Sequence, residues 1–210
     1  MIRVLIADDH PIVREGLKQI IAETPDMVVA NEASNAQEVL DKVWENDYSV
    51  VLLDISMPGR SGLDILKQLK SERPELPVLI LSVHPEEQYA VRVLRAGASG
   101  YLTKESAPDE LIAAIRKVSL GRKYVSSSLA EKLAFDLEIE AEKPLHETLS
   151  DREYQVLCMI AQGKTVKEIA EELSLSVKTI STYRSRILEK MRMNNNAQLT
   201  HYAIKNRLVE

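Results

Sequence analysis

The chain has 210 residues, of which 45% are apolar and 28% are charged, and its net charge is −5. This length suffices for one large or two modest domains, and a single cysteine, Cys158, excludes an internal disulfide and a cysteine metal cluster. Apolar stretches end after a few residues, far short of the roughly 20 that span a bilayer. The amino terminus reads as a strand and not as a signal peptide, so we expect a cytoplasmic protein with no membrane segment.

Charge is unevenly distributed along the chain. Residues 1–125 carry a net charge of −4, residues 126–147 carry another −4, and residues 148–210 carry +3. An anionic polymer is attracted to the basic part of a protein. We therefore expect any polyanionic partner to bind the last part of the chain.

The first 120 residues alternate short apolar runs with amphipathic segments. This alternation predicts an α/β fold with a doubly wound, five-stranded parallel sheet. Residues 50–53 lack polar alternation, which indicates a strand buried on both faces by helices. The expected strands cover residues 2–7, 27–33, 50–54, 78–82 and 100–102, and the expected helices begin near Pro11, after Ser34 as N-cap, after Ser61, near Glu86 and after Ala107.

Polar side chains stand where four of the expected strands end. These residues are Asp8 and Asp9 after the first strand, Asp54 after the third, Ser82 after the fourth and Lys104 after the fifth. Open α/β sheets bind ligands at the carboxyl ends of their strands, so we expect all five side chains around one crevice. Carboxylates, a hydroxyl and an ammonium together suit phosphate and Mg²⁺ chemistry.

Each of these groups has a separate expected role. A carboxylate attacks a phosphoryl group once the charges on both are neutralised, so Asp54 is the expected nucleophile that becomes an aspartyl phosphate. Asp8 and Asp9 are the expected Mg²⁺ ligands, with Asp9 the better candidate for direct coordination. Lys104 supplies positive charge to the phosphoryl oxygens, and Ser82 supplies a hydroxyl that follows the attached phosphate.

This arrangement resembles the receiver domain of two-component response regulators over residues 1–123. Residues 53–59 (LDISMPG) are close to the phosphoacceptor loop of that family, and residues 97–104 (GASGYLTK) are close to its lysine segment. The resemblance implies a flavodoxin-like sheet of order 2-1-3-4-5, a sensor histidine kinase as phosphodonor, and the Ser56 backbone carbonyl as a further ligand of Mg²⁺. It also implies that Ser82 and Tyr101 act as a switch, in which the Tyr101 ring turns inward when the Ser82 hydroxyl moves toward the phosphate. The alternative is that Tyr101 is an ordinary half-buried aromatic residue of the strand.

His84 lies two residues beyond Ser82 and has two interpretations. It either crowds the water that hydrolyses the phosphate or is an ordinary loop histidine. In the first interpretation, His84 would influence hydrolysis of the phosphate.

Residues 124–147 are expected to form a partly helical interdomain linker with the acidic run 138–142. The remaining residues, 148–210, show four helical patterns that predict a small all-α domain. Two capping boxes, a helix-ending glycine and a short helix before a long basic one together predict a helix-turn-helix. The supporting residues are Ser150 with Glu153, Thr165 with Glu168 and Gly163, and the last three helices are expected over residues 166–173, 177–193 and 197–206.

This second part resembles the LuxR-type helix-turn-helix of regulators grouped with NarL and FixJ. The residues that carry the resemblance are LSDRE at 149–153, GKTVKEIA at 163–170 and LSVKTISTY at 175–183. The resemblance implies binding to double-stranded DNA, with the long helix in the major groove. The expected DNA contacts are Lys178, Thr179, Ser181, Thr182, Arg184, Ser185, Arg186 and Lys190, and the opposite, core-facing side is expected to hold Val177, Ile180, Ile187, Leu188 and Met191.

Two positions depart from the family pattern. Many members carry lysine where this chain has Ser181 and histidine where it has Tyr183. A groove cation is therefore missing, and serine and threonine on the reading face predict no single base preference.

The last helix carries Leu199, Ala203, Ile204 and Leu208 with Tyr202. Part of this face is expected to close the core of the domain, and the remainder to meet a second copy in a homodimer formed on phosphorylation. RNA polymerase is a further possible partner of such a regulator.

These features predict a phosphorylation-switched transcriptional regulator and not an enzyme. One alternative is a Mg²⁺-dependent phosphohydrolase. Such an enzyme would need a second aspartate two residues after Asp54 to protonate the leaving group, and this chain has Ser56 there. The other is an interaction protein whose helix-turn-helix binds protein. Repeated turnover of phosphate esters would favour the former, and DNA binding that does not weaken with salt would favour the latter.

Overall fold

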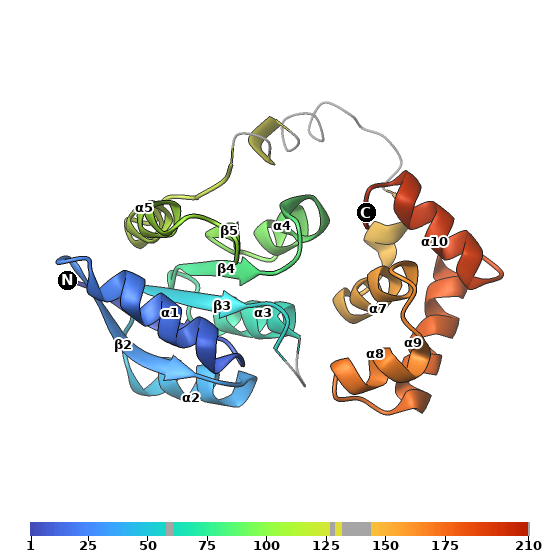
Figure 1. Ribbon diagram of the computed structural model, residues 1–210, viewed down its shortest axis with the longest axis horizontal. Helices are drawn as coiled ribbons and strands as arrows, with labels where there is room; N and C mark the ends of the chain where they lie inside the picture. The colour runs from blue at the N-terminus through green and yellow to red at the C-terminus, as the bar shows by residue number, and fades with distance from the viewer. Residues whose placement is uncertain (58–60, 127–128, 132–143, 210) are drawn as a thin grey trace. The chain divides into compact units, whose positions relative to one another are not determined.

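The protein was analysed as a computed structural model in which the chain divides into two units, residues 1–133 and 134–210. Element labels follow Figure 1. The structure describes residues 1–57, 61–126, 129–131 and 144–209.

Five parallel strands form the sheet of the first unit. They are β1 (Ile2–Ala7), β2 (Met27–Ala33), β3 (Val50–Asp54), β4 (Val78–Ser82) and β5 (Gly100–Thr103). Their order is β2-β1-β3-β4-β5, which confirms the predicted topology. Every residue of β3 and β4 is buried, as expected for central strands with helices on both faces.

Helices cover both faces of this sheet (Figure 1). On one face, α1 (Pro11–Ala22) and α5 (Pro108–Ser119) pack against apolar side chains of β1, β3, β4 and β5. The other face is covered by α2 (Ala36–Glu45), α3 (Gly62–Glu72) and α4 (Glu86–Arg95). Because the connections cross over the sheet, all five strand carboxyl ends meet at one edge.

The predicted N-cap of α2 is wrong by one residue. Asn35, and not Ser34, caps the helix, since its side chain accepts a hydrogen bond from the Glu38 backbone N–H at 3.0 Å. The Glu38 carboxylate reaches back to the Ser34 backbone N–H at 2.8 Å. Serine and asparagine cap equally well, so the sequence alone does not separate them.

The second unit consists of helices. They are the 3-10 helix η1 (Leu145–Thr148) and the α-helices α7 (Asp151–Ala161), α8 (Val166–Glu172), α9 (Val177–Lys190) and α10 (Asn196–Lys205). Both predicted capping boxes are present, at Ser150 with Glu153 and at Thr165 with Glu168. Cys158 is buried in the core of α7, as predicted.

The long helix α9 differs from its prediction in two respects. It ends at Lys190 and not near Met193, because Arg192 adopts a left-handed conformation with φ of 54° and the Met193 N–H bonds back to Leu188. Val177, predicted to face the core, is 50% exposed because it opens the helix. Ile180, Ile187 and Met191 are buried, as predicted.

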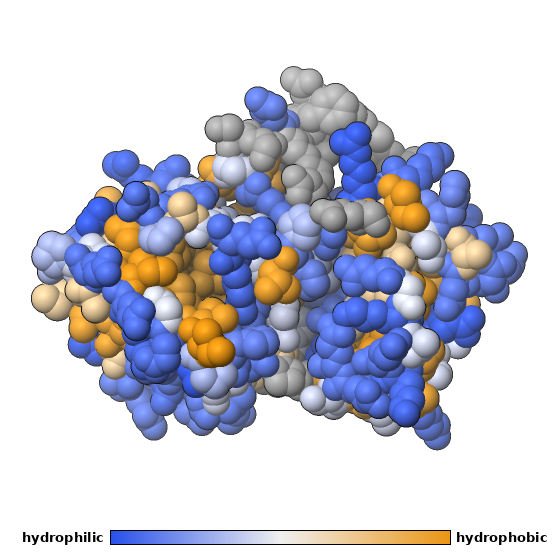
Figure 2. Space-filling view, viewed as in Figure 1, coloured by the Kyte–Doolittle hydropathy of each residue, from blue (hydrophilic) through white to orange (hydrophobic). Residues whose placement is uncertain are grey.

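Hydrophilic side chains predominate on the face shown in Figure 2, with apolar groups lying among them. Within the described ranges, no helix is long and apolar enough to cross a membrane. The acidic run 138–142 and most of the predicted linker helix lie outside the described residues.

Candidate functional site

The Lys104 ammonium joins two carboxylates at the carboxyl end of the sheet. Its Nζ lies 2.7 Å from Oδ2 of Asp54, the last residue of β3, and 2.6 Å from Oδ2 of Asp8, which follows β1. Both acids are 1% exposed. Topology therefore brings together three of the residues that the sequence singled out, from positions up to 96 apart along the chain.

Burial and ion pairing act in opposite directions on this cluster. Burial raises the pKa of the Asp54 carboxyl, and the nearby Lys104 only partly offsets that effect. Burial by itself would lower the pKa of the Lys104 ammonium, but Asp54 and Asp8 outweigh it and the pKa is raised. The lysine thus stays protonated and compensates negative charge where water is excluded.

The acidic cluster has the ligands that a divalent cation requires. Ligand atoms of Asp8, Asp9, His10 and Asp54 all lie within 4.8 Å of one another. Oδ2 of Asp8 and Oδ1 of Asp9 are buried, the first lying 2.6 Å from Lys104 Nζ and the second 3.0 Å from His10 Nδ1. Buried carboxylate oxygens of this kind suit Mg²⁺, which prefers oxygen ligands. The residues therefore fit the expected metal.

Ser82 and Tyr101 are connected through the loop that follows β4. Ser82 is fully buried, and its Oγ accepts a hydrogen bond from the His84 N–H at 3.1 Å. The Tyr101 hydroxyl donates to the His84 carbonyl at 2.8 Å, and its ring is 1% exposed. Tyr101 is therefore buried while Ser82 is bonded to this loop, and its predicted inward turn with movement of the Ser82 hydroxyl stays a prediction. The His84 ring lies 4.9 Å from that of Tyr89.

Two residues that support the site were missed by sequence reasoning. The His10 ring nitrogen Nδ1 lies 3.2 Å from Asp8 Oδ1 and 3.0 Å from Asp9 Oδ1. The Arg14 guanidinium donates to the Asp8 backbone carbonyl at 2.8 Å. The adjacency of His10 to the acidic pair was an available signal, whereas the Arg14 contact depends on where α1 packs.

Ser56 supports the start of the loop after β3 through its backbone. Its N–H donates to Asp54 Oδ1 at 2.8 Å, which fixes that carboxylate against the start of the loop. Pro58 and Gly59 of the quoted motif lie outside the described residues.

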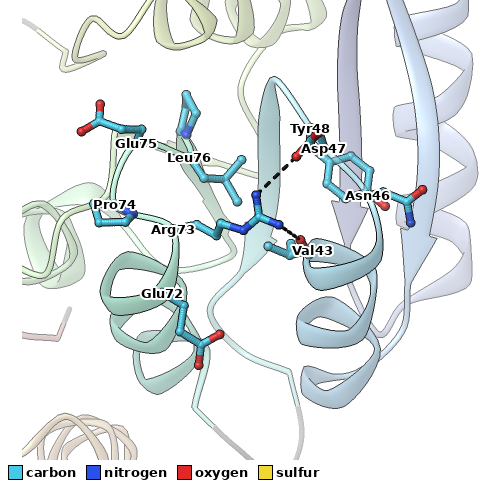
Figure 3. A pocket seen from close by; sticks show the side chains of 10 residues that line it. Val43, Asn46, Asp47, Tyr48, Glu72, Arg73, Pro74, Glu75 and Leu76 are labelled. Atoms are coloured by element: carbon cyan, nitrogen blue, oxygen red, sulfur yellow. Dashed lines mark hydrogen bonds and ion pairs between the residues drawn. The ribbon is translucent and has the colours of Figure 1, made fainter.

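A separate hollow lies at the amino-terminal ends of β3 and β4 (Figure 3). Its volume is about 350 Å³, and Arg73 reaches across it to the Asp47 carboxylate and the Val43 carbonyl, both at 3.3 Å. Because the acidic cluster stands at the opposite ends of these strands, this hollow takes no part in the site.

Helix α9 presents a polar stripe in the second unit. Exposed residues recur at helical spacing along it, namely Lys178, Ser181, Thr182, Ser185 and Arg186. Their exposure follows from the burial of Ile180 and Ile187 on the opposite side. Such a helix packs by one face and offers the other to a groove.

Three of the other predicted contact residues have partners inside the protein. Lys190 pairs with the buried Glu153 at 2.6 Å, and Arg184 Nε donates to Asn196 Oδ1 at 2.6 Å. The Thr179 hydroxyl lies 2.8 Å from that of Ser176 at the start of α9. These side chains therefore contribute to the fold of the unit.

Both units match known protein families. Residues 4–116 match the response regulator receiver domain, and residues 147–203 match the bacterial regulatory proteins of the luxR family. Among curated relatives, the response regulator UvrY of Escherichia coli K12 is 38% identical over 99% of this chain and 96% of its own. The response regulator GacA of Pseudomonas protegens is 37% identical over 100% of this chain and 99% of its own.

Solved structures are similar over nearly the whole length. RcsB of Salmonella enterica serovar Typhimurium, bound to the promoter rprA with the phosphomimetic BeF3−, has a TM-score of 0.65 and 28% identity, covering 96% of this chain and 98% of RcsB. A structure of two RcsB dimers on two parallel DNAs has a TM-score of 0.60 and 28% identity, covering 100% and 99% of the chains. The protein therefore belongs to the response regulators, as a phosphorylation-dependent transcription regulator with a receiver domain and a luxR-family DNA-binding domain.

Proposed function

We propose that Asp54 is the residue that accepts the phosphoryl group. The observation that carries this proposal is the buried Asp54 carboxylate held 2.7 Å from Lys104 at the strand end, beside two further acids. An Asp54 oxygen attacks phosphorus as the phosphorus–nitrogen bond of a kinase phosphohistidine breaks, and the phosphoryl group passes to the aspartate. The donor is a sensor histidine kinase or a small phosphodonor.

Mg²⁺ is the proposed cofactor of this transfer. Asp8, Asp9, Asp54 and the Ser56 backbone carbonyl would hold it, since the carboxylate oxygens at the site fit a hard cation. When bound, it neutralises charge on the carboxylates and the phosphoryl oxygens. Lys104 supplies the second positive charge to the product phosphate.

Ser82 and Tyr101 are the proposed switch. In the arrangement described above, the Ser82 hydroxyl accepts from the His84 N–H. Turning toward a phosphate on Asp54 would cost the loop that bond, and Tyr101 holds the same loop through the His84 carbonyl. The protein is proposed to act as a phosphoacceptor with slow self-dephosphorylation and not as an enzyme. His84 keeps both interpretations, a residue that crowds the attacking water or an ordinary loop histidine, and its ring lies beside that of Tyr89.

The proposed output is binding to double-stranded DNA through the exposed stripe of α9. RcsB, one of the similar solved proteins, is bound to DNA as dimers. For this chain we propose a homodimer that is favoured by phosphorylation, with Ile204, which is 54% exposed on α10, in the dimer contact. RNA polymerase is a further proposed partner, and the proposed boundaries are 1–123, 124–147 and 148–210.

Replacement of Asp54 tests the phosphoacceptor. Asp54→Asn should take up no phosphoryl group from a phosphodonor with Mg²⁺, and its DNA affinity should not respond to the donor. Wild type should gain one phosphoryl group by intact mass and bind DNA more tightly. Uptake by Asp54→Asn at the wild-type level, or equal tightening of its DNA binding, would refute the proposal.

Replacement of a stripe cation tests the DNA interface. Lys178→Ala should weaken DNA binding and reduce the slope of log affinity against log salt by about one, because one phosphate contact releases one counterion. Lys167, which is 79% exposed on α8, is the control, and Lys167→Ala should leave the slope unchanged. An unchanged slope for Lys178→Ala would remove that residue from the interface.

A further inference from the structure

The chain that leaves α5 pairs with the edge of the sheet. The Tyr124 N–H donates to the Ser99 carbonyl at 2.8 Å, and Tyr124 forms a parallel bridge with Gly100 at the start of β5. β5 is an edge strand, whose outer backbone groups would otherwise lack sheet partners. Residues 122–126, here called the strap, thus cover the start of this edge.

The strap approaches β5 so closely that a side chain would prevent it. A Cβ added to Gly100 would lie 2.7 Å from the Tyr124 carbonyl oxygen and 2.9 Å from its Cβ. Lys123 Nζ adds a hydrogen bond to the Ala98 carbonyl at 2.6 Å. Position 100 therefore requires glycine because the strap packs against it, and this requirement is independent of the proposed phosphate site.

Tyr124 fastens the middle of the strap to α5. Its hydroxyl donates to Glu110 Oε1 at 2.9 Å, and Lys117 Nζ lies 5.5 Å from the centre of its ring. Burial, together with Glu110, raises the pKa of Tyr124 to about 12. The phenol consequently remains a neutral donor throughout the physiological pH range.

The end of the strap contacts the start of α4, which directly follows the loop after β4. The Ser126 hydroxyl donates to Glu86 Oε2 at 2.5 Å. Glu86 is the first residue of α4, two positions after His84, whose N–H and carbonyl bond to Ser82 and Tyr101. One short loop therefore connects the proposed switch hydroxyl to the chain that continues toward the second unit.

We propose that the strap senses the loop after β4 through the bond between Ser126 and Glu86. While Ser82 accepts from the His84 N–H, the loop holds Glu86 in reach of Ser126 and the strap stays on β5. When Ser82 turns to a phosphate on Asp54, the loop relaxes, Glu86 withdraws, and the strap, which keeps its bonds from Tyr124 and Lys123, opens more often. This inference rests on the proposed phosphorylation of Asp54, and it names the segment that carries the change onward.

Hydrogen exchange on the full chain tests the strap. With Mg²⁺ and a small phosphodonor, we expect exchange of peptide amides over residues 122–126 to become about tenfold faster, which is the effect of losing roughly one net hydrogen bond. Intact mass, measured on the same sample, reports phosphoryl uptake. Uptake without faster exchange in the strap overturns the strap alone, whereas absence of uptake overturns the proposed function together with it.

Variants separate coupling from loss of structure. Ser126→Ala should exchange about tenfold faster than unphosphorylated wild type over residues 122–126, with or without the phosphodonor, because one hydrogen bond is lost, and Glu86→Ala should do the same. Glu86→Gln, which keeps an acceptor oxygen, should restore the response to phosphorylation. Ser119→Ala is the matched control, because among the described residues its hydroxyl bonds locally, to the Arg116 carbonyl, and it should behave as wild type.

A strap in Ser126→Ala that remains protected and still responds to phosphorylation would overturn the role of this contact. Gly100→Ala gives a second line of evidence that does not depend on phosphorylation. Gly100→Ala should speed the exchange of the amides over residues 122–126 while phosphoryl uptake persists. Amides that stay protected would contradict the close packing of Tyr124 on Gly100.

Discussion

At the scale of single residues, Lys190 is both a predicted DNA contact and the partner of a buried carboxylate. It is a predicted DNA contact, but it lies 2.6 Å from Glu153, whose side chain is 4% exposed and also closes a capping box. Lys190→Met should destabilise the full chain by about 1 to 2 kcal/mol, a low value for a charged pair because the lysine is 42% exposed. Denaturant unfolding measures this change in the free energy of unfolding. Lys167→Met is the control and should leave the free energy of unfolding unchanged.

The same ion pair predicts a pH dependence. Burial alone would raise the pKa of Glu153, but Lys190 and the Ser150 N–H outweigh it and hold the pKa below its usual value of 4.5. A carboxyl with a lowered pKa stabilises the folded state above its unfolded pKa and loses that contribution as pH falls through the lowered value. The difference between wild type and Lys190→Met should thus be full above about pH 4.5 and shrink below it; a constant difference would contradict it.

Gly62 packs closely against the backbone of Asp54, the proposed phosphoacceptor, and of Ile55. An added Cβ would lie 2.5 Å from the Ile55 Cα and 2.7 Å from the Asp54 carbonyl oxygen. Gly62→Ala should displace this backbone, destabilise the protein by about 1 to 3 kcal/mol and slow phosphoryl uptake about tenfold or more. Thermal unfolding and intact-mass kinetics measure both effects.

Gly16 supplies the control for that substitution. It lies within α1, and an added Cβ would meet no atom of the described part of the chain within 4 Å. Gly16→Ala should stabilise the protein by about 0.5 to 1 kcal/mol without slowing uptake, because alanine favours a helix. Equal behaviour of the two variants would show that the crowding at Gly62 is unimportant.

At the scale of elements, several helices end in a left-handed residue that closes a backbone bond. Ser174 has φ of 53°, and the Leu175 N–H bonds back to the Ala170 carbonyl, which ends α8 and sets the turn before α9. Serine adopts this conformation at a cost that glycine avoids. Ser174→Gly should therefore raise the unfolding free energy by up to about 1 kcal/mol, measured by denaturant titration, and a destabilised variant would contradict this reading.

Element types followed from the sequence more readily than element ends. The capping boxes located the starts of α7 and α8, since hydroxyl and carboxylate three residues apart satisfy backbone donors locally. The end of α9 was placed about three residues too late, because Arg192 carries no local signal for a left-handed conformation. Ser34 and Asn35 likewise compete for one cap, and only the folded backbone selects between them.

At the scale of the whole molecule, Ile204 tests the proposed dimer. Leu199 and Ala203 on the same helix are buried in their own unit, whereas Ile204 is 54% exposed. Ile204→Glu should keep the fold but weaken dimerisation of the phosphorylated protein about tenfold or more, because a carboxylate would be buried at the contact. Sedimentation measures it, with Ile204→Leu as the control; an unchanged dimer would exclude Ile204 from the contact.

The sequence by itself determined the alternation of strands and helices, the separate basic unit and the set of strand-end residues, because these depend on local periodicity, capping and charge. The tertiary structure alone decided which of these residues touch, since Asp8, Asp54 and Lys104 meet only through the strand order. It also decided that Lys190 and Arg184 have internal partners and that the strap lies on β5. Such contacts join residues distant in sequence, and no local pattern encodes the packing that brings them together.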